Sequence, residues 1–435
     1  MEQKNIFKNR ILIKEVFSKK NKTVELAGWV HNTRDLSKVK FLLLRDRTGL
    51  IQITGVKSKT PKEIFKDLEK IPRESVIYVK GDVVESKQAP GGKEILPQEL
   101  IIINKAETLP IDVTDFSKTE LPKRLDNRFL DTRRKPIQAI FKIQSTISMS
   151  FREYFVKKDF VEIQTPSIIS SSSEGGTELF EAKYFEKKAY LAQSPQLYKQ
   201  MLAGAVENVM TIVPVWRAEK HNTIRHLNES RQMDIEMAFV NTKVVMKELE
   251  EVVKYIIEKI IEKNKEELEI LKIKLKIPKV KYLTFKEVAD LMKKSKIKIE
   301  EDDLTGEAEK KLGNLFPDTI VFVYDWPLEG KPFYIMPKDK KADAKLSEGF
   351  DAIYKGMEIS SGGQRIHLPK LLETRIKTKG LKVKDFKTYI DSFKFGSPPH
   401  AGWSIGLERL TMLILNLPNI REAVLFPRDR DRLTP

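Results

Sequence analysis

Two β-like segments joined by a highly charged loop constrain this chain most strongly. Ile212–Trp216 and Met233–Phe239 alternate apolar and polar side chains, as strands with one buried face do. Charged or ionisable side chains follow the first segment at Arg217, Glu219, Lys220, His221, Arg225, His226 and Arg231. This pattern indicates a β-hairpin that binds an anionic ligand. A solvated surface loop between two strands would have the same composition.

The order Arg-x-Glu, loop, Arg within Thr211–Val240 resembles motif 2 of class II aminoacyl-tRNA synthetases. Two further stretches resemble the remaining motifs of that family. His400–Leu417 is similar to motif 3, a strand that leads into an apolar helix carrying Arg409. Arg128–Pro166 is similar to motif 1, a long amphipathic helix followed by a strand. The resemblance implies an α+β multidomain protein whose catalytic domain is an antiparallel β-sheet flanked by helices.

Length and charge fit this resemblance without proving it. A chain of 435 residues suggests two or three domains. Its net charge of +17 favours a polyanionic partner such as RNA, and adaptation to high temperature would also explain it. The chain has no cysteine, which excludes disulfides and cysteine-based metal sites. It shows no apolar signal segment or membrane span, so we expect a cytoplasmic protein.

The pattern of the first 105 residues predicts a five-stranded OB-fold β-barrel. A helix-prone piece, Pro61–Lys70, falls between the third and fourth β-rich segments, as in an OB barrel with its inserted helix. The five segments are Val24–His31, Val39–Leu44, Ile51–Thr54, Val76–Val84 and Ile95–Ile103. We expect residues 1–105 to form this domain, 106–130 to be a linker or hinge, and 131–435 to form the catalytic domain.

The OB domain resembles the anticodon-binding domain of class IIb synthetases. OB folds bind single strands with aromatic platforms and basic grooves, although Phe41 by itself would also fit a core position. The resemblance implies tRNA anticodon contacts at His31, Arg34, Phe41, Gln52, Pro90 and Glu94.

Two of these positions bear on which tRNA is bound. Strictly discriminating archaeal-type aspartyl enzymes tend to have a Trp after the GWV-like strand and a Lys before the fifth strand. This chain has His31 and Pro90 there, as relaxed relatives do. The resemblance therefore implies that tRNA-Asn is used as well as tRNA-Asp. A strict enzyme stays an alternative, because His31 would also fit a solvated strand end.

The small and polar stretch Ser170–Leu202 suits a loop that closes over a substrate, followed by a helix beginning near Pro195. A capped helix without any site is the alternative. EGGT and SPQLYK resemble the aspartate pocket of aspartyl-tRNA synthetases. That resemblance implies that Glu174 binds the ammonium group and Lys199 the side-chain carboxylate, with Gln196 beside them. The full expected aspartate site is Glu174, Gln196, Lys199, Arg217, Asp234, Ser361 and Arg365, where Asp234 would orient the cations.

A second chemical centre lies in FDAIYKGMEISSGGQRIH. A hairpin turning at Lys355-Gly356 would pair Ile353 with Glu358, which puts Asp351 and Glu358 on one face. Two carboxylates there would suit Mg²⁺, which takes its remaining ligands from water and phosphate; solvent-facing carboxylates are the alternative.

Alternation places Ser361 on the opposite face unless Gly362-Gly363 kinks the chain. The family pattern nevertheless makes Ser361 a third metal candidate, beside Asp351 and Glu358.

The resemblance implies catalytic roles for Arg217, Glu358 and Arg409. The ATP site would comprise Arg217, Ala218, Glu219, Arg225, His226, Leu227, Glu358, Gly406, Leu407, Glu408 and Arg409. His226 stands where many class II enzymes place a Phe that stacks on adenine. Trp403 and Ser404 replace the more usual residues of motif 3. Residues 264–318 give no site.

Together these features predict an aspartate–tRNA ligase that uses ATP and Mg²⁺. It would be a homodimer, because the apolar stripe Ile137–Phe155 of the motif 1 helix would otherwise be exposed. An asparaginyl-tRNA synthetase shares all three motifs, but Lys199 argues against it. A non-catalytic RNA-binding paralogue should have lost Arg217, Glu358 or Arg409, and all three are present. The chain shows no class I signature or P-loop.

Overall fold

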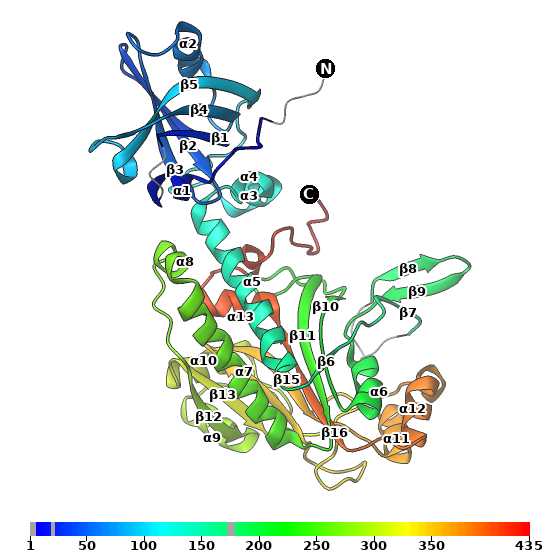
Figure 1. Cartoon of the computed structure of the whole chain (residues 1–435). Coiled ribbons are helices and arrows are strands. Elements are labelled where there is room, and N and C mark those ends of the chain that lie inside the picture. The colour runs from blue at the N-terminus through cyan, green and yellow to red at the C-terminus, as the bar shows by residue number, and fades with distance from the viewer. Residues whose placement is uncertain (1–5, 19–21, 172–178) are drawn as a thin grey trace. The chain divides into compact units, whose positions relative to one another are not determined.

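The computed structural model describes residues 6–18, 22–171 and 179–435 (Figure 1). The chain divides into two compact units, Met1–Asp112 and Val113–Pro435. Within the described residues, no helix is both long and apolar enough to cross a lipid bilayer.

The first unit is a closed five-stranded barrel with strand order β1-β2-β3-β5-β4. Its strands are β1 (Thr23–Asp35), β2 (Val39–Asp46), β3 (Gly49–Val56), β4 (Val76–Glu85) and β5 (Lys93–Asn104). Helix α1 (Ile13–Ser18) precedes them, and α2 (Lys62–Lys70) connects β3 to β4. Inward-facing side chains such as Leu26, Leu42, Ile53 and Val79 are fully buried in the barrel. The predicted OB fold and its inserted helix are confirmed.

The second unit is built on an eight-stranded sheet with the order β12-β13-β14-β15-β16-β11-β10-β6. These strands are β12 (Lys279–Thr284), β13 (Thr319–Tyr324), β14 (Gly349–Tyr354), β15 (Met357–Gln364), β16 (His400–Gly406), β11 (Glu229–Ala238), β10 (Asn208–Trp216) and β6 (Val161–Glu162). The predicted antiparallel pairing is confirmed from β13 to β10, whereas both edge strands pair in parallel. A separate small sheet contains β7 (Ile168–Ile169), β9 (Lys187–Leu191) and β8 (Glu181–Tyr184).

Helices flank the large sheet, as Figure 1 shows. The long helices α5 (Lys135–Val156) and α7 (Thr242–Lys263) pack with α13 (Leu407–Ile414) into the main hydrophobic core. The other helices of this unit are α3 (Leu121–Asp126), α4 (Arg128–Asp131), α6 (Gln196–Val206), α8 (Lys265–Ile270), α9 (Phe285–Lys294), α10 (Gly306–Leu315), α11 (Pro369–Thr378) and α12 (Lys387–Lys394).

The apolar stripe of α5 is buried within the chain itself. Ile140, Ile147, Phe151 and Phe155 are at most 3% exposed, because α7 and the sheet cover them. Our expectation that this stripe would be exposed in a monomer is therefore wrong. Burial of the stripe stabilises the unit and does not require a second subunit.

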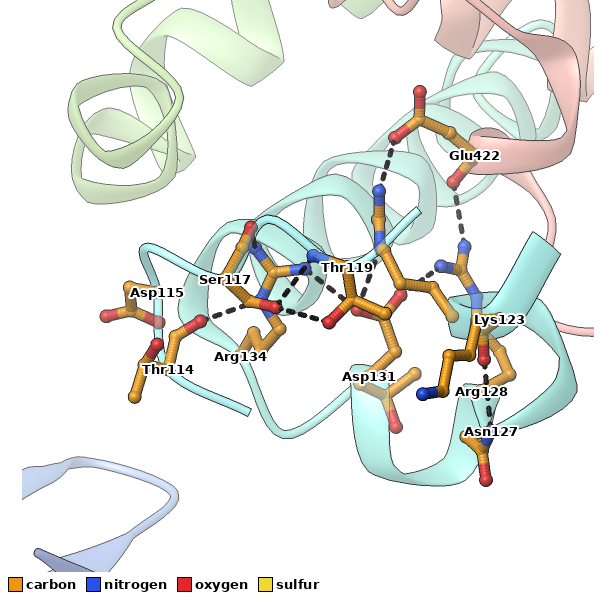
Figure 2. Close-up of polar contacts among 12 residues, drawn as sticks. Thr114, Asp115, Ser117, Thr119, Lys123, Asn127, Arg128, Asp131, Arg134 and Glu422 are labelled. Carbon is orange, nitrogen blue, oxygen red and sulfur yellow. Dashed lines mark hydrogen bonds and ion pairs between the residues drawn. The ribbon is translucent and has the colours of Figure 1, made fainter. Parts of the chain in front are cut away.

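Residues 106–130, which we expected to be a linker, span the boundary between the two units. From Val113 onward the segment belongs to the second unit, because it packs on a fully buried carboxylate at Asp131. That carboxylate accepts hydrogen bonds from Arg128 at 2.6 Å, Arg134 at 3.0 Å and Arg124 at 3.1 Å. Figure 2 shows this cluster. Together the guanidinium groups offset the desolvation of Asp131.

The β14–β15 hairpin has the predicted Ile353–Glu358 pair, and it also contains a bulge. Ala352 pairs with Ser360, which leaves Ile359 as an extra residue on β15. Asp351 consequently pairs with Ser361, and directly opposed residues of two strands lie on the same face. The expectation that Ser361 faces away from Asp351 and Glu358 is wrong, because the bulge shifts the alternation by one residue.

Glu408 joins β11 to α13 from a buried position. Its carboxylate accepts hydrogen bonds from the backbone nitrogen of Arg231 at 2.9 and 3.1 Å. The side chain is only 5% exposed, and burial raises the pKa of Glu408 to about 7. A raised pKa means that the folded state retains a proton that the unfolded chain releases near pH 4.5.

This pKa shift predicts that Glu408→Gln increases the free energy of unfolding in a pH-dependent way. The Glu408 contribution to stability is complete below pH 4.5 and is lost as pH rises through about 7. The glutamine oxygen still accepts from Arg231 and carries no charge. We expect the variant to be more stable at pH 8 by up to about 3 kcal/mol, with no gain at pH 4.5. Urea unfolding at both pH values measures the difference.

Exposed Glu262 provides the control. Its pKa is lowered by the hydrogen bond from Lys259, so Glu262→Gln should give no gain at pH 8. Equal effects of the Glu408 substitution at both pH values would contradict the assignment.

Candidate active site

A cavity of about 300 Å³ gathers most of the predicted site residues. Its walls come from the sheet and from the loop between β10 and β11. The predicted residues that line it are Gln196, Arg217, Glu219, Arg225, His226, Leu227, Glu358, Ser361, Arg365, Gly406, Glu408 and Arg409. Glu174 lies outside the described residues.

A buried group of alternating charges lies beside this cavity. Lys199 of α6 donates to Asp234 at 2.8 Å and lies 3.5 Å from Glu236, both on β11. Arg365 donates to Glu236 through Nε at 2.9 Å and Nη2 at 3.3 Å. Burial would raise the pKa of Glu236, but the charges of Arg365 and Lys199 hold that pKa below its ordinary value. Each of the four side chains therefore has a side chain of opposite charge type beside it, which offsets the cost of burial.

Glu236 is the residue that sequence analysis missed here. We expected Asp234 to orient both cations, but it pairs with Lys199 and accepts from Ser404 Oγ at 2.7 Å. Arg365 is held by Glu236 instead. The signal was present, since alternation along β11 puts positions two residues apart on one face. The sequence alone did not show that Arg365 lies beside Glu236 of β11.

Gln196 is held by a polar network behind the cavity. Its Nε2 donates to Gln200 Oε1 at 2.9 Å, and the hydroxyl of Tyr389 donates to the same oxygen at 2.9 Å. Gln200 also lies 3.1 Å from His400 Nε2, and burial lowers the pKa of His400. The network fixes the first turn of α6, which carries Gln196 and Lys199.

The β10–β11 loop presents Arg225 and His226 to the other end of the cavity. Arg225 forms an ion pair with Glu309 of α10 at 3.3 Å. His226 Nδ1 lies 2.7 Å from Thr223 Oγ1, and its pKa is lowered by burial. Glu309 comes from a region in which we expected no site. Burial and the charge of Glu358 raise the pKa of Glu309 to about 7.

Asp351 and Glu358 provide the carboxylates expected for a metal. Burial and the charge of Asp351 raise the pKa of Glu358, as for two like charges that share a site. Asp351 contacts Lys331 at 2.5 Å, and the backbone oxygen of Glu358 accepts from Arg409 at 3.0 Å. Within the described residues, no cluster of three or more acidic or histidine side chains could hold a metal. Two hard oxygen donors still fit Mg²⁺ when a ligand supplies phosphates.

Two predicted ATP residues lie elsewhere. Ala218 lines a second cavity, together with Trp216 and residues of the C-terminal segment. The side chain of Leu407 is buried in the main hydrophobic core. In both cases the neighbouring residue faces the first cavity, because successive side chains on an extended chain or a helix point in different directions.

The barrel unit has its own cavity of about 290 Å³, lined by Arg34, Phe41, Gln52 and Pro90 among others. Glu94 is held beside it and accepts from Gln52 at 2.7 Å. Phe41 faces this cavity and not the barrel core.

His31 occupies a different place from the other predicted anticodon residues. It lies at a bulge in β1, and its Nδ1 is 3.1 Å from Arg45. Among the residues that the structure describes, those that line the barrel cavity do not include His31.

Comparisons with known proteins agree with this geometry. The family model "tRNA synthetases class II (D, K and N)" matches residues 120–430, and "OB-fold nucleic acid binding domain" matches residues 24–103. An aspartate–tRNA(Asp/Asn) ligase of Methanopyrus kandleri is 47% identical over 418 residues, covering 95% of this chain and 96% of the relative. An aspartate–tRNA(Asp) ligase of Thermococcus kodakarensis is 46% identical over 422 residues, covering 95% and 96%.

One solved structure has a closely similar fold. The asparaginyl-tRNA synthetase of Pyrococcus horikoshii complexed with asparaginyl-adenylate has a TM-score of 0.92 and 34% identity, covering 98% of this chain and 99% of that one. The resemblance inferred from the three motifs is confirmed. The chain belongs to the class II tRNA synthetases of the D, K and N group, and it carries their OB-fold domain.

Proposed function

We propose that this protein is an aspartate–tRNA ligase, and the buried Lys199 beside Arg365 is the observation that carries the proposal. A substrate carboxylate entering the cavity meets Arg365 directly and the positive charge of Lys199 behind it. Such a site favours aspartate because a carboxylate gains more from desolvated cations than a neutral amide does. The names of the relatives in Methanopyrus kandleri and Thermococcus kodakarensis support the same substrate.

The proposed reaction has two steps. An oxygen of the α-carboxylate of L-aspartate attacks the α-phosphorus of ATP, and pyrophosphate leaves. The 3′-terminal hydroxyl of the tRNA then attacks the aspartyl carbonyl, and AMP leaves. Arg217 would bridge the aspartate carboxylate and the α-phosphate, while Arg225, His226 and Arg409 bind the departing phosphates. Catalysis rests on orientation and charge stabilisation, without a protein nucleophile.

Asp351 and Glu358 would hold Mg²⁺, with Ser361 on the same face of the hairpin. The ion would neutralise phosphate charge when bound with ATP. We place the reaction in the cytoplasm, where tRNA and ATP meet.

Asparagine is the second candidate substrate, because the structure from Pyrococcus horikoshii has asparaginyl-adenylate in a closely similar fold. The Arg365 guanidinium at the cavity wall favours aspartate instead, because a charged carboxylate gains more from a guanidinium than a neutral amide does.

We further propose that both tRNA-Asp and tRNA-Asn are charged. Pro90 lies in the barrel cavity with Arg34, Phe41 and Gln52, where a lysine would add a charged donor for an anticodon base. Without such a donor the site discriminates less between C and U at the third anticodon position.

A homodimer is also proposed, for a different reason from the one given by the sequence. Met149, Val156 and Val161 are exposed near the β6 edge of the sheet. An open edge strand with apolar neighbours favours pairing with a second copy.

The proposed role of Arg217 predicts a large loss of activity in the Arg217→Ala variant. Removing one preorganised donor should slow aspartate-dependent ATP–pyrophosphate exchange about a hundredfold, or roughly 2.7 kcal/mol. Arg231→Ala is the control, since the Arg231 side chain pairs with Glu229 and does not line the cavity. Near-normal exchange by Arg217→Ala would refute the assignment.

The specificity proposal predicts similar charging of tRNA-Asp and tRNA-Asn transcripts by the wild-type enzyme. Pro90→Lys should shift the preference toward tRNA-Asp. His31→Trp should have a smaller effect, because His31 contacts Arg45 outside the cavity. A wild-type preference of about a hundredfold for tRNA-Asp, worth about 2.7 kcal/mol, would rule out relaxed specificity.

The dimer proposal predicts that Val161→Asp weakens self-association, because a charge on the open edge would be buried in the interface. Sedimentation equilibrium at micromolar concentration measures the change. Phe395→Asp replaces another exposed apolar residue and should leave the oligomeric state unchanged. A monomeric wild-type protein would contradict the proposal.

A further inference from the structure

A C-terminal segment, residues 419–432, contacts the β10–β11 loop along its length. The backbone nitrogen of Ile420 donates to Ile224 O at 3.0 Å. Arg430 donates to Lys220 O at 3.0 Å, and Asn228 N donates to Arg428 O at 2.8 Å. These bonds reach the loop before and after Arg225 and His226. The segment therefore lies against the part of the loop that presents Arg225 and His226 to the cavity.

Arg421 is the centre of this contact. Its side chain is mostly buried, and its guanidinium donates to Thr223 O at 3.0 Å and to Asn222 Oδ1. The same guanidinium is paired with Asp429. Asn222 in turn donates to Asp431. A planar guanidinium can hold several acceptors in fixed directions at once, which a lysine ammonium cannot do.

The segment is itself anchored on the other side by the Asp131 cluster. Arg128 donates to the backbone oxygens of Glu422 at 3.1 Å, Val424 at 2.9 Å and Leu425 at 3.2 Å. Figure 2 shows Arg128 between Asp131 and Glu422. Because Asp131 is fully buried and fixes Arg128, the segment has a rigid support from which it can hold the loop.

We propose that Arg421 is a positioning residue for ATP: it holds Asn222 and Thr223 so that Arg225 and His226 face the cavity. This inference rests on the proposed ATP-binding role of that loop. The residues proposed for aspartate, Lys199 and Arg365, are instead held by partners on the sheet. Loss of the Arg421 contacts should therefore affect ATP binding and spare aspartate binding.

The test uses two variants of the full-length enzyme. Arg421→Lys keeps the charge and removes the fork geometry. Asn222→Ala removes the loop side of the same contact at an exposed position, so it remains informative if the first variant folds poorly. Arg432→Ala is the matched control, because Arg432 belongs to the same segment but pairs with Asp126. ATP–pyrophosphate exchange gives KM for ATP and for aspartate separately, and melting temperatures report on folding.

We expect both variants to raise the KM for ATP about tenfold, as displacement of a binding group does, with the KM for aspartate within about twofold of wild type. Amide hydrogen exchange over residues 217–228 should become faster in both variants and stay unchanged in Arg432→Ala. Equal changes in the two KM values, or no change in either, would overturn the positioning role.

The same experiment separates this inference from the proposed function. A wild-type enzyme without aspartate-dependent exchange would refute the function, and hydrogen exchange would still decide whether Arg421 orders the loop. Unchanged loop exchange in Asn222→Ala would overturn the inference even if the enzyme is active.

Discussion

Two carboxylates buried on one strand impose the main requirement on the catalytic unit. Asp234 and Glu236 of β11 are fully buried, and an ionised carboxylate without partners would cost several kcal/mol at such a place. Their partners come from three other segments: Lys199 on α6, Ser404 on β16, and Arg365 after β15. Meeting the electrostatic requirement of β11 thus also fixes how the helix and the neighbouring strands converge on the cavity.

Regular patterns in the sequence were sufficient for most of the fold. Alternation along β10 and β11, the OB strand order and the apolar stripe of α5 each depend on local spacing, and the structure has all of them. The family resemblance also brought together Arg217, Glu358 and Arg409, which lie directly after β10, on β15 and in the first turn of α13. Local periodicity did not reveal what covers α5, since α7 lies about a hundred residues further along the chain.

The features that sequence analysis missed all depend on partners distant in the chain or on local irregularity. The bulge at Ile359 reverses the alternation that placed Ser361, and an extra strand residue has no clear composition signal. Glu309 contacts Arg225, which lies 84 residues earlier in the chain. The helix that carries Glu309 has the composition of an ordinary charged surface helix. Residues 106–130 were expected to be a linker because of their prolines and mixed charge, whereas Arg124 and Arg128 of this segment join a buried cluster around Asp131.

The two halves of the cavity differ in how their charges are balanced. Near Lys199 and Arg365, each cation has its own buried carboxylate, so that half is balanced without a ligand. The guanidinium groups of Arg217 and Arg225, on the loop, and of Arg409, on α13, line the other half of the cavity, and like charges repel each other. The loop therefore needs external support until phosphates bind. Contacts from Glu309 and from the C-terminal segment supply that support, which preorganises the site for a polyanion at the expense of loop entropy.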